Sequence, residues 1–104
     1  MTMSSFSFAE LQPRINSEFR LHLPDGGQVP MQLIECRATG PGGDENSFVL
    51  TFKAGPGAPI EQAAYPVETA GIEPEPIFLV PARHRPDDPD FPLEYHAVFN
   101  RLPG

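Results

Sequence analysis

The stretch FRLHLPDGGQVPMQLIEC, residues 19–36, decides the fold, because it has the pattern of a β-hairpin. Its first part, residues 19–23, alternates apolar with polar residues, which is typical of a strand with one buried face. The turn, residues 24–27, contains a proline that fixes φ and glycines that permit the positive φ values of a tight reversal. The alternation resumes over residues 29–33, so the sequence predicts two antiparallel strands.

Four further segments have strand patterns, three of them alternating and one, residues 76–82, a compact apolar run bounded by prolines, and together with the hairpin they predict a fold of about six strands. They are residues 47–55, 64–69, 76–82 and 93–100. The clearest pattern places Phe48, Leu50 and Phe52 on one buried face. Short strands at regular spacing, joined by turns, are typical of a small antiparallel barrel or sandwich. The predicted fold class is therefore all-β, with one short N-terminal helix.

Three details of the strand arrangement follow from single residues. The apolar phase slips by one position after Leu33, which predicts either a β-bulge in the second strand of the hairpin or a change in which face of that strand is covered. Pro66 lacks a backbone N–H, so the segment 64–69 is expected to form an edge strand. The last segment, residues 93–100, is expected to pair with the hairpin and close the sheet.

The N-terminal helix is predicted from a capping box. Ser7 and Glu10 have the S-x-x-E spacing that begins a helix, here over residues 8–12, and Pro13 disfavours its extension. Asn16 is expected in the left-handed conformation that reverses the chain into the first strand. Apolar residues of this segment should cover one end of the sheet or barrel. Residues 1–5 are expected to be a disordered tail on a single domain, residues 1–104.

The charge of the chain excludes several classes of partner. The 104 residues include 14 Asp and Glu but only 7 Lys and Arg, which gives a net charge of −7. Because the basic residues are also scattered along the sequence, nucleic acid and anionic membranes are predicted not to be partners. No apolar run approaches the ~20 residues of a membrane span. The N-terminal residues have no signal-peptide pattern, so the cytoplasm, or a larger particle, is the expected location.

Five pieces of the sequence carry a family resemblance. They are FRLHLPDG, SFVLTFKAGP, QAAYPV, FLVP and YHAVFN, which begin at residues 19, 47, 62, 78 and 95. Together they resemble a family of small bacterial proteins described only as a domain of unknown function, and the likeness covers nearly all of residues 8–100. Because members tend to be encoded near phage-tail-collar-like proteins, the resemblance implies a structural or accessory role. The chain departs from the family at Asn16, where glycine is common, and in an insert at residues 83–92.

Catalytic chemistry has weak support in the sequence. Cys36 is the single cysteine, and a nucleophilic role would need a histidine that lowers its thiol pKa. His22 lies across the same hairpin, which leaves a hydrolase built from these two residues as one alternative. Neither residue has a known cysteine–histidine signature around it, and a lone cysteine among apolar neighbours is usually a small core residue. We therefore predict that the chain is not an enzyme and has no catalytic residues.

One cluster of metal-ligand residue types occurs near the C-terminus. Its spacing matches neither a calcium loop nor a zinc site, and prolines between the acidic residues hinder wrapping around an ion. We therefore predict a solvated acidic loop, with no metal, no cofactor and no cofactor-binding residues. Glu94, on the outward parity of its strand, is expected to be exposed. The cluster consists of His84, Asp87, Asp88, Asp90 and His96.

The function that these observations favour is a non-enzymatic structural or protein-interaction module, accessory to a phage-tail-like or surface assembly. Its partner would bind at the expected edge strand 64–69 or at the loops 38–47 and 83–92. Self-association by edge pairing is left open. The alternative is a small β-barrel that holds an apolar ligand, which disagrees with an interior expected to be filled by Phe19, Phe48, Phe52, Phe78 and Phe99. The predicted partner-binding residues are Tyr65, Val67, Glu68, His84, Arg85 and Asp87.

Overall fold

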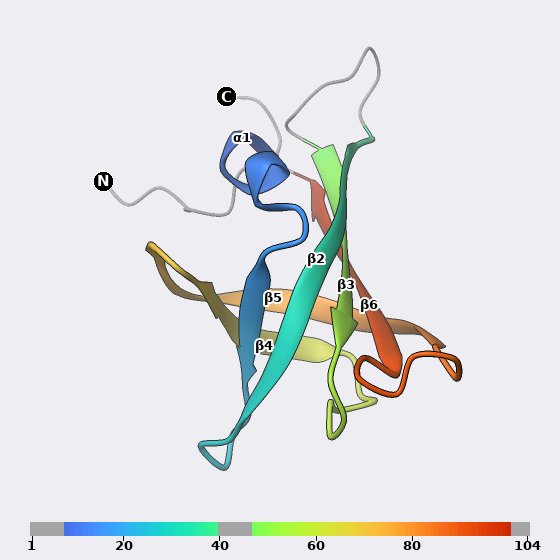
Figure 1. Cartoon of the computed structure of the whole chain (residues 1–104). Helices are drawn as coiled ribbons and strands as arrows, with labels where there is room; N and C mark the ends of the chain where they lie inside the picture. Colours follow the sequence, from blue (N-terminus) through green and yellow to red (C-terminus); the bar gives the residue numbers. More distant parts are fainter. Residues whose placement is uncertain (1–7, 40–46, 101–104) are drawn as a thin grey trace.

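The computed structural model describes residues 8–39 and 47–100 as a closed antiparallel β-barrel of six strands (Figure 1). Around the barrel the order is β1-β2-β3-β6-β5-β4. The predicted all-β class and strand number are confirmed, and the barrel form replaces the open choice between barrel and sandwich. The strands are β1 (Glu18–His22), β2 (Gln28–Ala38), β3 (Ser47–Ala54), β4 (Ala63–Thr69), β5 (Ile72–His84) and β6 (Leu93–Asn100).

The predicted hairpin is formed by β1 and β2, which pair from Glu18↔Gln32 to His22↔Gln28. Of the two turn glycines, Gly26 takes the positive φ, 92°, and its N–H donates to the carbonyl oxygen of Leu23 at 3.0 Å. The local turn chemistry therefore specifies this reversal. The predicted bulge in β2 is also confirmed, since the pairing with β3 shifts register between Leu33 and Glu35.

The N-terminal helix is shorter than predicted and ends in a 3-10 turn. The α-helix α1 spans Phe8–Leu11, and the 3-10 helix η1 continues over Gln12–Arg14. Asn16 then adopts a φ of 77°, which confirms the left-handed reversal. Ser7 of the expected capping box and the expected tail, residues 1–5, lie outside the described residues.

This helix covers one end of the barrel. Leu11 is fully buried, and the ring of Phe8 meets the ring of Phe48 edge-on, with 6.0 Å between centroids. Phe48 in turn stacks on Phe99 of β6 at 4.6 Å. In Figure 1, α1 lies beside the ends of β2, β3 and β6 that extend past β4 and β5.

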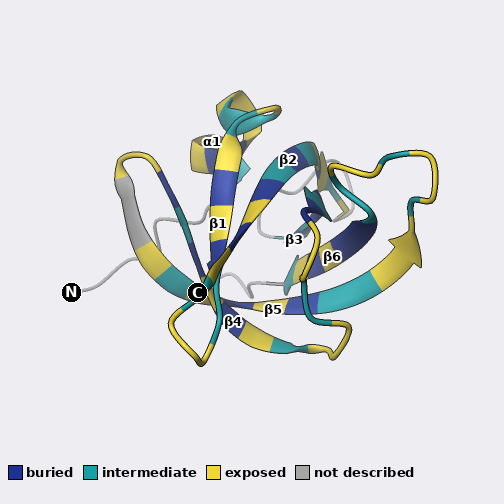
Figure 2. Ribbon diagram, turned by 60° about the horizontal axis from the view of Figure 1, so that its bottom comes forward, coloured by how far each residue is buried: buried dark blue, intermediate teal, exposed yellow. Residues whose placement is uncertain are grey.

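Buried and exposed residues alternate along most strands (Figure 2), so side chains from all six strands meet in one core. Phe48, Leu50 and Phe52 are buried as predicted. The expectation for Phe78 is wrong, because its side chain is 53% exposed and its neighbours Ile77 and Leu79 point inward. The physical reason is that residues 76–82 are almost uniformly apolar, so their sequence does not indicate which parity is buried.

Two expectations about strand pairing are wrong. β6 pairs with β3 and β5 instead of the hairpin, and the barrel closes where β1 pairs with β4. β4 is therefore no edge strand. Pro66 is accommodated because it stands opposite Pro76, which also lacks an N–H, and one residue past the last β1–β4 pair, Leu21↔Val67. In the part of the chain that the structure describes, no helix is long and apolar enough to cross a membrane.

Candidate functional site

The six residues predicted to bind a partner fall in two places that the structure keeps apart. The last pair between β4 and β5 is Ala63 with Leu79, so the end of β5 lies about 17 Å further along that strand. The two groups are Tyr65, Val67 and Glu68 on β4, and His84, Arg85 and Asp87 at the end of β5 and in the loop that follows it.

The β4 group does not present a continuous surface. Tyr65 and Val67 point into the barrel and are 8% and 0% exposed. The Tyr65 hydroxyl donates to the carbonyl oxygen of Glu61 at 2.8 Å. Glu68 points outward, and its Oε1 lies 2.5 Å from His22 Nε2, which ties β4 to β1. Because both side chains are buried, a partner cannot bind β4 through Tyr65 and Val67.

The second group lies together around an open cavity of about 480 Å³. Its lining comes from one continuous segment that begins in β5 and turns into the β5–β6 loop. This is the part of the predicted site that the structure brings together. The lining residues are Arg83, His84, Arg85, Pro86, Asp87 and Asp88.

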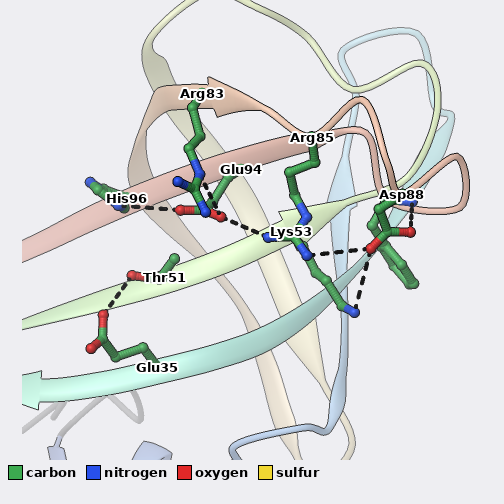
Figure 3. A network of polar contacts seen from close by, with 9 residues as sticks. Glu35, Thr51, Lys53, Arg83, Arg85, Asp88, Glu94 and His96 are labelled. Carbon is green, nitrogen blue, oxygen red and sulfur yellow. Dashed lines mark hydrogen bonds and ion pairs between the residues drawn. The ribbon is translucent and has the colours of Figure 1, made fainter.

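A buried carboxylate anchors this segment to the barrel wall. Glu94 of β6 is 7% exposed, so the expectation of an exposed side chain is wrong. Its Oε2 accepts a hydrogen bond from Arg85 Nη1 at 2.9 Å and lies 3.4 Å from Arg83 Nε (Figure 3). The cause is a register shift between Pro81 and Arg83, which places Arg83 opposite Glu94. Two guanidinium groups from β5 and its loop therefore cover the carboxylate.

The loop itself is held by further polar contacts. Arg85 N–H donates to the carbonyl oxygen of Pro92 at 2.7 Å, which closes the loop at its base. Asp88 Oδ2 lies 3.4 Å from Arg85 Nη2 and 3.8 Å from Lys53 Nζ, so the loop also contacts β3. The Lys53 ammonium stands over the Phe91 ring, 4.9 Å from its centroid. These contacts fix the loop conformation that presents Arg83, His84 and Asp87.

Basic residues from different parts of the fold gather here. Lys53 comes from β3, whereas Arg83 and Arg85 come from the end of β5 and the loop after it. His96 lies on the same outer face, with Nε2 3.8 Å from Glu94 Oε1. The interpretation that the basic residues are scattered rather than gathered missed this cluster. The register shift between Pro81 and Arg83 that brings Arg83 opposite Glu94 cannot be detected from the alternation of apolar residues.

A separate polar contact joins the neighbouring strands β2 and β3. Thr51 Oγ1 donates to Glu35 Oε1 at 3.2 Å across the β2–β3 pair (Figure 3). Thr51 is 4% exposed although its position in β3 predicts an outward side chain. Neighbouring side chains on this outer face therefore shield Thr51 from water.

Cys36 has the environment of a core residue. Burial raises the pKa of its thiol from 9.0 to about 11, whereas a nucleophile needs a lowered pKa. His22 pairs with Gln28 at the far end of β2, eight residues from Cys36, which corresponds to about 26 Å along the strand. His22 bonds with Glu68 instead. The cysteine–histidine pair that a hydrolase would require is not formed.

The described residues form neither a cluster of metal ligands nor an empty barrel interior for an apolar ligand. Among residues 8–39 and 47–100, no three His, Cys, Asp or Glu side chains gather as metal ligands would. The barrel interior holds large side chains, including the fully buried Tyr95, Phe19 and Phe52. The rings of Phe19 and Phe52 meet edge-on at 5.2 Å. An apolar ligand would therefore have to displace side chains that already fill this space.

Comparison with known proteins places the chain in a family. A family model described as a domain of unknown function, DUF6916, covers residues 6–99. Neither the curated proteins nor the solved structures give a significant match to the chain.

Proposed function

We propose that this chain, which belongs to the DUF6916 family of domains of unknown function, is a non-enzymatic protein-interaction module. The partner protein would bind at the segment Arg83 to Asp88. The observation that carries the proposal is that this loop is fixed to the barrel through Arg85 and Glu94 while the side chains of Arg83, His84 and Asp87 remain exposed.

Preorganisation makes such a loop suitable for recognition. A loop that is already ordered loses little conformational entropy on binding, so more of the contact energy appears as affinity. The Arg85–Glu94 and Lys53–Asp88 contacts supply that order from two different strands. Loops held by a rigid scaffold commonly carry binding residues.

The exposed side chains offer both signs of charge. The Arg83 side chain is 69% exposed although its Nε lies 3.4 Å from Glu94 Oε2, so most of this side chain is in water. His84 and Asp87 are exposed beside it. A cavity of about 480 Å³ that presents a guanidinium, an imidazole and a carboxylate fits a polar protein surface better than an apolar small molecule.

The finer part of the proposal concerns the identity of the assembly. The resemblance described above supports a partner from a phage-tail-like or other surface assembly, with the chain as an accessory component. Such a role needs binding and no catalysis, which agrees with the core environment of Cys36.

The test is affinity capture from the native organism with the wild-type chain and two variants. Arg83→Glu reverses an exposed charge at the loop and should lower recovery of the specific partner about tenfold, equivalent to ~1.4 kcal/mol. Arg20→Glu is the matched control, because Arg20 is exposed on β1, across the barrel from β6. The control should recover the partner as the wild type does.

Two outcomes would contradict this function. Equal recovery of every protein by wild type and Arg83→Glu would exclude the loop as the binding surface. Recovery of no protein by the wild type would contradict the interaction role itself. A partner without resemblance to tail, collar or surface proteins would contradict only the finer proposal.

A further inference from the structure

The outer face of β4 and β5 carries a block of four exposed apolar residues. Ala64 pairs with Phe78, and Pro66 pairs with Pro76, so the four side chains occupy neighbouring positions on two paired strands. All four residues are exposed. We call this block, Ala64, Pro66, Pro76 and Phe78, the apolar wall.

The apolar wall is unusual because its members are contiguous. Single exposed apolar residues are normal on protein surfaces, whereas contiguous apolar patches mark binding surfaces. Phe78 dominates the patch, since more than half of its side-chain surface meets water while Ile77 and Leu79 fill the core beside it. The exposed ring of Phe78 therefore contributes little to the stability of the fold. Its burial by a partner would remove a large apolar surface from water.

The apolar wall continues into a depression of about 350 Å³. Leu23 and Pro24 of the β1–β2 turn line it together with Ala64 and Pro66. Glu61 lies at the same depression and is exposed. The apolar surface thus has a polar side, which Glu61, Gln62 and His22 form.

Charge decides which kind of partner fits. No Lys or Arg is among the residues that line the depression, whereas Glu61 and His22 are, and His22 Nε2 lies 2.5 Å from Glu68 Oε1. Arg20 stands opposite Glu68 in the β1–β4 pairing, so Glu61 carries the acidic charge at the depression. The chain as a whole carries a net charge of −7. A second copy would bring the same negative charge, so self-association through this surface is disfavoured and a basic partner is favoured.

The spacing of the apolar wall indicates the conformation of the partner. Its side chains recur at every second residue along β4 and β5, about 7 Å apart, which is the spacing of alternate side chains in an extended chain. We infer that the apolar wall binds an extended segment of a partner protein in which apolar side chains alternate with Lys or Arg. This surface is separate from the loop Arg83 to Asp88 that carries the proposed function, so the two sites can be tested independently.

The experiment measures binding of three short synthetic peptides by fluorescence anisotropy. The probe is Lys-Val-Lys-Phe-Lys-Val-Lys, an acidic version replaces each Lys with Glu, and a polar version replaces each Val and Phe with Ser. We expect the probe alone to bind the wild-type chain. Phe78→Ser should weaken this binding about tenfold or more, as loss of an aromatic anchor does. Ile60→Ser is the control, because Ile60 is 72% exposed and lies outside the apolar wall.

A pair of variants at Ala64 tests the charge requirement without removing an apolar anchor. Ala64 is exposed opposite Phe78, so either replacement should fold. Ala64→Lys should weaken binding of the basic probe, and Ala64→Glu should retain or strengthen it. Arg83→Glu should leave peptide binding unchanged, which separates this surface from the loop.

Several results would overturn the inference. Binding of the polar basic peptide as strong as that of the probe would mean that charge alone drives the association. Equal affinity of wild type and Phe78→Ser would exclude the apolar wall. A wild-type dimer in light scattering that Phe78→Ser dissociates would assign the surface to self-association, and binding to anionic vesicles that Phe78→Ser abolishes would assign it to membranes.

Discussion

Arg85 Nη1 donates a hydrogen bond to Glu94 Oε2 at 2.9 Å, and this contact ties the β5–β6 loop to the barrel wall. The carboxylate is almost completely buried, although its position in β6 faces outward. Buried ion pairs contribute little net stability against an apolar alternative, but removing one partner is costly. The pair therefore holds the loop in one conformation and makes the fold sensitive to single substitutions.

Glu94→Gln should lower the free energy of unfolding by about 1–3 kcal/mol, because the charged guanidinium of Arg85 loses its ionised partner. Urea unfolding followed by circular dichroism measures the change. Glu61→Gln is the matched control, since Glu61 is exposed and should change stability by less than about 0.5 kcal/mol. Equal stability of the two variants would contradict an anchoring role for Glu94.

The hairpin and the N-terminal reversal could be predicted from the sequence because their causes are local. Gly26 and Asn16 both take the positive φ that their residue types favour. The β-bulge after Leu33 was one of two explanations that the phase slip in the apolar pattern allowed, and the register shift between Leu33 and Glu35 shows that it is the right one. Each of these features depends on a few consecutive residues.

The strand order could not be predicted, because it depends on pairings between residues far apart in the chain. Periodicity states which face of β6 is buried, but not that its neighbours are β3 and β5. The position of Phe78 was missed because its neighbours are apolar on both parities. The loop cluster was missed because a register shift after Pro81 brings Arg83 opposite Glu94.

Cys36 should react slowly with a thiol reagent in the folded protein. Burial raises its pKa to about 11, so the thiolate fraction at pH 8 is about 100-fold below that of an ordinary cysteine. Labelling in native buffer and in urea, followed by mass spectrometry, compares the two rates. Rapid labelling of the folded chain would show that the thiol is accessible and would reopen the nucleophile hypothesis.

Stability should fall above about pH 9. Burial raises the pKa of Cys36 from 9.0 to about 11, and burial with the nearby Tyr65 raises that of Tyr95 above 10.0. The folded state thus retains protons that the unfolded chain releases, and the free energy of unfolding decreases as pH rises through this range. Cys36→Ala should remove the part of the decrease that begins near pH 9. An unchanged pH profile in this variant would contradict the assignment.

Two phenylalanines should respond oppositely to truncation. Phe52→Ala should cost about 3–5 kcal/mol, because its ring is fully buried against Phe19. Phe78→Ala should change stability by less than about 0.5 kcal/mol, because its ring stands on the outer face. Thermal or urea unfolding distinguishes them. A large loss of stability for Phe78→Ala would mean that the parity of β5 is reversed.

Asn16 should tolerate glycine but not alanine. Its φ of 77° is unfavourable for a residue with a Cβ, although asparagine adopts it more readily than most. The conformation is fixed, because Asn16 N–H donates to the carbonyl oxygen of Leu33 at 2.6 Å and its own carbonyl oxygen accepts from Gln32 Nε2 at 3.1 Å. We expect Asn16→Ala to lower the free energy of unfolding by about 1 kcal/mol and Asn16→Gly to match the wild type. Urea unfolding in which the alanine variant equals the glycine variant would show that no backbone strain resides at this position.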